Sequence, residues 1–259
     1  MNRRLMAAGA ALVAVLAVAG PSWAYPNFAG ATGGSALPDD QVQRTGTWML
    51  AGDWQHLDAF QTAGGEGDAL HFRAVFGFAD RAEVGVAWSD LDIFNLSGWS
   101  GSAKVQLLRE PQSMLGLTVG GSFSDLTDSG SEIQSTSLFA VISKQFMGNR
   151  QSGSFRAYAG GLNNDLQADI PGVVFIDDSE TNIFAGLAYM TPDRRFELQG
   201  EWMDKAFGGD ALWSVVARWY SPSRSTAIQI GWTNSLGPIP IGTQNSGIHL
   251  GIAFMGGVH

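Results

Sequence analysis

Along residues 45–255, large apolar residues recur at every second position, with polar or small residues between them. A period of two is typical of β-strands whose two faces differ in polarity. Each patterned run has about ten residues, the length of a tilted strand that crosses a bilayer. The predicted strands span 45–57, 68–79, 82–90, 99–109, 113–124, 132–146, 153–163, 180–190, 194–204, 210–220, 224–233 and 246–255.

The connections between these runs form two alternating sets. One set is short and rich in Pro, Gly, Asn and Asp, as tight turns require, and lies around 80–81, 109–113, 147–153, 191–195 and 221–225. The other set is generally longer and covers 58–67, 92–98, 126–131, 166–179, 205–209 and 235–245. Short turns on one side and longer loops on the other indicate an outer-membrane barrel with periplasmic short turns. With an even number of strands, the N- and C-termini of the barrel chain both lie on the periplasmic side.

The first short turn has a predictable length. Large apolar residues occupy even positions both before and after it, at 72–78 and at 82–88. The residue numbers of two cross-strand neighbours on this face must therefore add up to an even number. This requires an odd number of residues in the turn. We predict a three-residue turn, Ala79 to Arg81, that pairs Phe78 with Ala82 and Phe76 with Val84.

The two strand faces predict a lumen and a lipid-facing surface. The polar face gives the lumen candidates His71, Arg73, Glu83, Lys104, Arg156, Tyr158, Glu197, Glu201, Arg218 and His249. Aromatic residues gather near both ends of the apolar face, as in the aromatic girdles of membrane barrels. The predicted interface aromatics are Phe78, Trp88, Trp99, Trp202, Trp213, Trp219, Trp232 and Phe254. The alternative architecture is a secreted two-sheet β-sandwich with an apolar interior.

Residues 138–142 are apolar on both faces. Either they pack against something inside the lumen, or the strand assignment there is wrong.

Composition narrows the function classes. The chain has no cysteine, which excludes disulfides, thiolate metal sites, a cysteine nucleophile and a lipoprotein anchor. Charged residues make up 15%, below the roughly 25% of an average soluble domain. The formal charge of −9 argues against nucleic-acid binding, which needs a basic surface.

Residues 1–24 have the layout of a cleaved secretory signal peptide. Arg3 and Arg4 precede an apolar run from Leu5 to Ala19, and small residues follow Gly20 and Pro21. That run is shorter than the ~20 apolar residues of a membrane-spanning helix. We therefore expect a signal peptide at 1–24, an N-terminal periplasmic or lumen segment at 25–44 and an outer-membrane β-barrel at 45–259.

The chain shows two resemblances to known proteins. Gly247, Leu250, Ile252 and Phe254 resemble the C-terminal signal that barrel-assembly machinery recognises, although five residues follow the aromatic. Residues 28–41 and 180–202 resemble the YjbH-type outer-membrane family, with Gly34 and Ser35 where that family has Leu and Thr-Pro. The resemblance implies an outer-membrane barrel associated with exopolysaccharide or capsule export.

Neither catalysis nor metal binding is predicted. No G-x-S-x-G motif is present, and His71 and His249 lie on different strands, with no nucleophile that the sequence places beside them. The acidic residues Asp177, Asp178 and Glu180 lack the spacing of a Ca²⁺ loop. We expect no cofactor, no metal and no enzymatic activity.

Pairing of neighbouring strands predicts one charge pair in the lumen. If the strands on either side of 205–209 are paired, Arg218 lies near Glu197. Such a pair either selects solutes by charge or closes a narrow lumen as a structural bridge. The loop 164–179 either plugs the barrel mouth or contacts a partner.

The sequence thus predicts a single transmembrane, antiparallel, up-and-down β-barrel of about twelve strands in the outer membrane. The first functional hypothesis is a narrow channel or export port for small solutes or saccharide. The alternatives are a non-conducting structural or adhesion barrel that acts through its loops, and a barrel enzyme, which we disfavour. Expected partners are outer-membrane lipid, lipopolysaccharide, barrel-assembly machinery and polysaccharide-export proteins.

Overall fold

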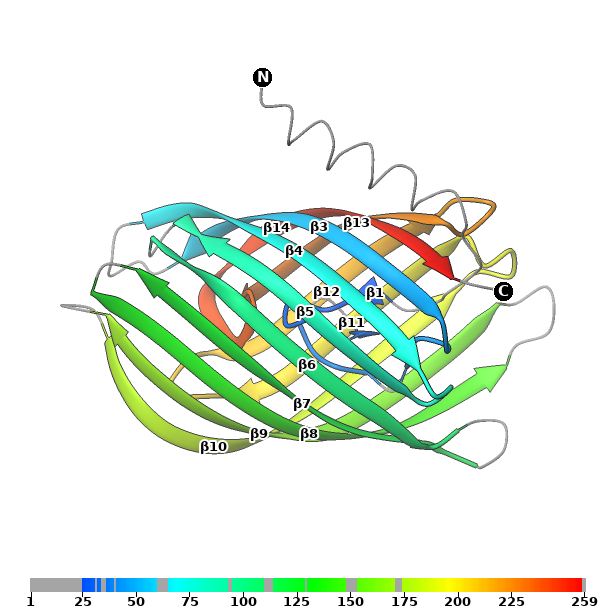
Figure 1. The fold of residues 1–259 in the computed structure, drawn as a ribbon, viewed down its shortest axis with the longest axis horizontal. Coiled ribbons are helices and arrows are strands. Elements are labelled where there is room, and N and C mark those ends of the chain that lie inside the picture. Colours follow the sequence, from blue (N-terminus) through cyan, green and yellow to red (C-terminus); the bar gives the residue numbers. More distant parts are fainter. Residues whose placement is uncertain are drawn as a thin grey trace, which may run out of the picture.

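The computed structural model describes residues 25–30, 32–33, 36–39, 41–59, 65–92, 95–109, 114–128, 130–147, 153–170 and 174–257. The predicted signal peptide, 1–24, lies outside the described residues. The fold is all-β, and twelve antiparallel strands close into a single barrel, as predicted (Figure 1). No helix in the described part of the chain is long and apolar enough to cross a membrane.

The wall consists of strands β3 to β14 in sequence order. They are β3 (Thr47–Ala59), β4 (Gly65–Phe78), β5 (Ala82–Leu91), β6 (Leu96–Leu108), β7 (Gly116–Asp128), β8 (Ser131–Met147), β9 (Ser154–Ile170), β10 (Val174–Met190), β11 (Phe196–Lys205), β12 (Ala211–Tyr220), β13 (Thr226–Leu236) and β14 (Ile239–Gly257). The last strand pairs with the first, with Leu250 opposite Trp54, so the sheet has no open edge.

The two predicted registers are confirmed. Phe78 pairs with Ala82 and Phe76 with Val84, which leaves residues 79–81 as the turn. Glu197 lies opposite Arg218 on β11 and β12. Parity of the apolar positions was sufficient for the first, because a one-residue slip would turn every side chain to the wrong face. The second followed from pairing of the strands on either side of 205–209.

Two of the predicted long loops, 166–179 and 235–245, are wrong as loops, whereas 206–209 is a turn as predicted. Most of 166–179 and of 235–245 is strand, since β9 and β10 pair from Ser154 and Met190 out to Ile170 and Val174. On the outer part of β9 the exposed residues are polar, as at Asp165 and Gln167, while Leu166 between them is buried, so the apolar outward pattern of a membrane strand ends while backbone pairing continues. In the other direction, the strand predicted from 113 begins at Gly116.

Side chains alternate between the outside of the barrel and its lumen. The outward positions carry exposed apolar side chains, such as Phe72 at 55% and Ile230 at 55% exposure, whereas the inward positions carry buried charges. This is the reverse of a soluble barrel and the arrangement of one that spans a bilayer. The doubtful stretch 138–142 follows the same rule: Leu138 and Ile142 face outward, while Phe139 and Val141 are buried inside.

A second structural unit occupies the lumen. We call residues 25–44 the N-terminal segment; its short strands β1 (Tyr25–Pro26) and β2 (Thr32–Gly33) pair only with each other. In Figure 1 the segment, in blue, runs within the ring of wall strands. Phe28 and Leu37 are completely buried and belong to a cluster with Phe139 and Val141, which explains the apolar inward face of β8.

Candidate functional site in the lumen

The N-terminal segment joins the wall at the rim that carries the short turns. The Gly46 amide donates to the Gly77 carbonyl at 3.0 Å, and the Asp80 amide donates to Thr45 Oγ1 at 2.5 Å. The hydrogen bond with Thr45 also lowers the pKa of the Asp80 carboxyl. These contacts fix the point at which the chain turns from the lumen into β3.

Phe28 anchors the segment in the lumen against three side chains of the wall. Its ring centroid lies 4.7 Å from that of His71, 5.6 Å from that of His249 and 5.4 Å from the guanidinium carbon of Arg73. His71 and His249 come from β4 and β14, the two strands on either side of β3. A cation over an aromatic face is attractive, and more so where water is excluded.

Asp39 anchors the segment by charge. Its Oδ2 lies 2.8 Å from Nη2 of Arg156, and its Oδ1 lies 3.5 Å from Nζ of Lys104. Lys104 also donates to the Asp39 carbonyl at 3.1 Å and lies 3.6 Å from Glu83. Burial raises the pKa of Asp39, but Arg156 and Lys104 outweigh it, and the pKa is held below its ordinary value. The carboxylate is therefore charged and matched within the lumen.

Two backbone amides of the segment bind wall carboxylates. Ala36 donates to Glu201 Oε2 at 3.2 Å, and Gln43 donates to Glu83 Oε2 at 2.7 Å. Hydrogen bonds to charged acceptors are stronger than neutral ones. These contacts hold the second half of the segment, at residue 36 and near its end at residue 43.

From Glu201 a chain of hydrogen bonds continues across β9, β11 and β12. Tyr158 Oη donates to Glu201 Oε1 at 3.0 Å and accepts from Gln199 Nε2 at 2.7 Å. Arg218 Nη1 donates to Gln199 Oε1 at 2.7 Å. Glu197 accepts from Tyr220 Oη at 2.6 Å and lies 3.7 Å from Arg218. The predicted Glu197–Arg218 pair is therefore one link in a larger network.

The network ends on β3 and β4. Arg218 Nε donates to Gln229 Oε1 at 3.1 Å, and Gln229 Nε2 donates to Asp53 Oδ1 at 2.5 Å. Asp53 forms a fully buried ion pair with Arg73, the residue that contacts Phe28. Matched charges of this kind keep a lumen closed and rigid, since removal of one partner leaves an uncompensated buried charge.

The histidines do not form an accessible catalytic site. His71 Nδ1 lies 2.9 Å from Ser89 Oγ, which is a serine–histidine contact the sequence analysis missed. Both side chains are fully buried, and Phe28 covers His71. A nucleophile must reach a substrate, so we interpret the pair as part of the packing under Phe28.

The opposite end of the lumen is filled by the turn between β13 and β14. Gly237 and Ile239 are buried, and Gln55 Nε2 donates to the Ser235 carbonyl at 2.9 Å. Pro238 of this turn meets the N-terminal segment around a cavity of about 20 Å³, which it lines with Asn27 and Ala36. A cavity of that size holds about one water molecule, so the lumen is occluded there.

The structure places all ten predicted lumen residues among the buried side chains. Seven of them contact the N-terminal segment: His71, Arg73 and His249 at Phe28, Lys104 and Arg156 at Asp39, Glu83 at Gln43, and Glu201 at Ala36. Sequence reasoning missed Phe28, Asp39 and Asp53. A signal for Asp39 was present: Arg156 faces inward between Ala188 and Gln145, so neither strand neighbour supplies an acid. An inward arginine without an acidic cross-strand neighbour predicts a partner from outside the wall.

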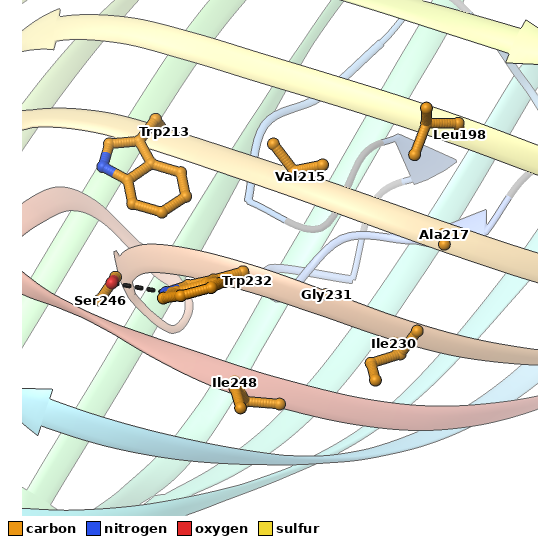
Figure 2. Close-up of a pocket in the computed structure, with 9 residues that line it drawn as sticks. All are labelled: Leu198, Trp213, Val215, Ala217, Ile230, Gly231, Trp232, Ser246 and Ile248. Atoms are coloured by element: carbon orange, nitrogen blue, oxygen red, sulfur yellow. Dashed lines mark hydrogen bonds between the residues drawn. The ribbon is translucent and has the colours of Figure 1, made fainter.

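The predicted interface aromatics lie on the outer face. Phe78, Trp99, Trp202, Trp219 and Trp232 are exposed, and Trp88, Trp213 and Phe254 are half-buried. Figure 2 shows a shallow outer hollow of about 570 Å³ between β11 and β14, where Trp232 Nε1 donates to Ser246 Oγ at 2.5 Å. Ala217 leaves room between Val215 and Ile230, and the surrounding side chains are apolar, as a lipid-facing surface requires.

The loop predicted at 164–179 does not enter the lumen where it is described. Residues 164–170 and 174–179 continue the wall as paired strands. Its acidic end is used structurally, since Glu180 Oε2 accepts from the Phe207 amide at 2.8 Å. Within the described residues, no group of three or more His, Asp or Glu side chains is placed to hold a metal ion.

No model of a known protein family matches the chain, and no curated protein matches its sequence. Solved barrels share its fold. The KdgM porin in complex with disordered oligogalacturonate gives a TM-score of 0.55 at 8% identity over 82% of this chain and 99% of that one. The KdgM porin alone gives 0.50 at 10% identity with the same coverage, and Omp33 of Acinetobacter baumannii gives 0.49 at 11%, covering 81% and 97%. At sequence identities this low, the similarity shows a shared fold and nothing further.

Proposed function

We propose that the chain spans the outer membrane of a bacterium as a channel for small polar solutes. In the state described, the N-terminal segment closes the channel. The observation that carries this function is that the barrel wall encloses enough space for the N-terminal segment, which forms no part of the wall. If that peptide moves, the same space becomes a conduit lined by Lys104, Arg156, Glu83 and Glu201.

The outer surface supports the location. Its exposed apolar side chains lie between two sets of aromatic residues, as in barrels that span a bilayer. The fold shared with porins agrees with this location. We further propose that lipid, lipopolysaccharide and barrel-assembly machinery are its partners and that residues 1–24 are a cleaved signal peptide.

A saccharide is the solute class that we propose. The support is the resemblance of residues 28–41 to YjbH-type proteins, together with the oligogalacturonate bound to one KdgM structure. An export role with polysaccharide-export partners would follow from the first of these.

The alternative is a non-conducting barrel that acts through its outer loops. The occluded lumen and its matched charges favour it, because a purely structural interior needs no more than filling. We consider an enzyme less well supported, since the serine–histidine contact is buried.

Single-channel recording separates the two. The mature chain and a chain that lacks residues 25–43 are reconstituted in planar bilayers, and heat-dependent gel migration shows that each is folded. We expect brief, rare openings from the mature chain and steady ion current from the shortened one. A folded, shortened barrel without current would contradict the channel and favour the structural alternative.

A further inference from the structure

Asp39 places a carboxylate of the N-terminal segment beside two cations of the wall. The wall contributes Lys104 from β6, Arg156 from β9 and Glu83 from β5. The strand neighbours of Lys104 are Glu83 and Gly120, and those of Arg156 are uncharged. The Asp39 carboxylate lies 2.8 Å from Arg156 and 3.5 Å from Lys104, so the segment supplies an acidic partner to both cations.

The surrounding groups suit hydroxyls as well as a carboxylate. Glu201 accepts from the Ala36 amide and Glu83 accepts from the Gln43 amide, so both wall carboxylates bind donors that belong to the segment. If the segment moved, the oxygens Glu201 Oε2 and Glu83 Oε2 would be open to hydrogen bonds from other donors, while Tyr158 and Lys104 stay beside the other oxygen of each carboxylate. The site therefore combines two cations for a carboxylate with two acceptors for hydroxyl groups.

The segment is held by noncovalent contacts and is joined to the wall at its Thr45 end. Residues 36–39 fill the space beside Arg156 and Tyr158, and the Arg156 guanidinium carbon lies 5.7 Å from the centroid of the Tyr158 ring. The space that these four residues occupy would hold a molecule of monosaccharide size or somewhat larger.

We propose that Lys104 and Arg156 form the binding site for the carboxylate of a hydroxylated acid such as a sugar acid, and that Asp39 stands in for this carboxylate while the channel is closed. Such a solute competes with Asp39 and displaces the segment. This inference rests on the proposed channel function and names its solute class.

The test compares glucuronate with glucose, which differ in the carboxylate. Binding to the mature chain in detergent is measured by calorimetry, for the wild type and for Asp39→Asn. Because Asp39 no longer competes, we expect glucuronate to bind Asp39→Asn about tenfold more tightly or better, with no gain for glucose. Adding Arg156→Gln should remove the gain, whereas adding Arg81→Gln, at an exposed turn, should leave it.

Equal affinity of the wild type and Asp39→Asn for glucuronate would overturn the proposal, as would an equal gain for glucose. If Asp39→Asn does not fold, Leu37→Cys provides a second readout, because the chain has no other cysteine. Glucuronate should then accelerate thiol labelling of residue 37 and glucose should not; no acceleration refutes the site. Binding is measured without a membrane, so a chain that conducts but does not bind refutes only this site, and one that binds but does not conduct refutes only the channel.

Discussion

Gly85 lies where the N-terminal segment passes close to the barrel wall at Gly30. It points inward from β5, and a Cβ atom at this position would collide with the Gly30 carbonyl and lie 2.8 Å from the Gly30 carbonyl carbon. Backbone atoms cannot rotate aside as a side chain can. A glycine is therefore required there if the segment is to stay in place.

We predict that Gly85→Ala displaces the segment while the barrel remains closed. Overpacking costs about 1–3 kcal/mol, which corresponds to roughly a tenfold or larger increase in the displaced population. Thiol labelling of Leu37→Cys, at a fully buried position, measures that population. Gly101→Ala is the matched control, since its Cβ would meet no atom within 4 Å. Equal labelling in the two variants would show that Gly85 is not a contact point of the segment.

The lowered pKa of Asp39 predicts that the position of the N-terminal segment depends on pH. Burial raises its pKa, yet Arg156 and Lys104 bring it below the ordinary value of 3.8. A lowered pKa means that the carboxylate stabilises the closed state above 3.8 and loses this effect as the pH falls through the lowered pKa. Labelling of Leu37→Cys with dithiodipyridine should stay slow from about pH 7 to 5 and accelerate below about pH 3.8.

The variant Asp39→Asn is the control for this titration. It lacks the charge at every pH, so its labelling should be faster than that of wild type at pH 7 and change less on acidification. Equal acceleration in both chains would assign the acid response to other carboxylates, such as Glu83 or Glu201.

Among the strands and turns, the turn between β4 and β5 has the predicted register, but its residues adopt an unfavourable backbone conformation. Ala79 and Asp80 have φ angles of 53° and 56°, in the left-handed region. A residue with a Cβ atom is strained there by about 1–2 kcal/mol. The sequence revealed the length of this turn through the parity of Phe78 and Ala82, but neither residue type at 79 or 80 indicates its conformation.

We predict that Ala79→Gly stabilises the barrel. Relief of the strain exceeds the entropy that glycine loses on folding, so the free energy of unfolding should rise by about 0.5–1 kcal/mol. Ala82→Gly, three residues later and within β5, should lower it by a similar amount, about 0.5–1 kcal/mol. Urea unfolding in lipid vesicles measures both. A loss of stability in Ala79→Gly would show that the left-handed turn is not strained.

The lengths of β9 and β10 show why element boundaries were harder to predict than elements. Within the membrane, lipid on one side and lumen on the other impose alternation, as at Leu187 and Ala188. Beyond it, Asp165 pairs with Ser179 in the same ladder, but the exposed residues of β9 there, Asp165 and Gln167, are polar, so the pattern of apolar outward residues ends. The hydrophobic pattern therefore reported the membrane-facing part of each strand and not its paired length.

At the scale of the whole molecule, the strands followed from the period of two, the barrel from the alternating short and long connections, and the identity of the outer face from the aromatic residues at both ends of the apolar face. The occupant of the lumen did not. Residues 25–44 have no period, and their contacts with Arg156, Glu201 and His71 join parts of the chain more than 40 residues apart. Such contacts depend on the closed barrel, which single-sequence patterns do not describe; only the doubly apolar stretch around Phe139 and Val141 indicated that something packs inside.

The outer face of β12 is expected to lie in the hydrocarbon of the bilayer. Val215 faces outward at 49% exposure on β12, between Trp213 and Trp219, the two aromatics that mark the ends of the apolar band. A lysine near the midplane must be transferred from water into hydrocarbon, so Val215→Lys should lower the free energy of unfolding in phosphatidylcholine vesicles by about 2–4 kcal/mol. Ser223→Lys, in the exposed turn between β12 and β13, places the same charge in water and should change it by less than about 0.5 kcal/mol. If the two substitutions have the same small effect, the outer face of β12 does not lie in lipid, and the apolar surface would need another partner.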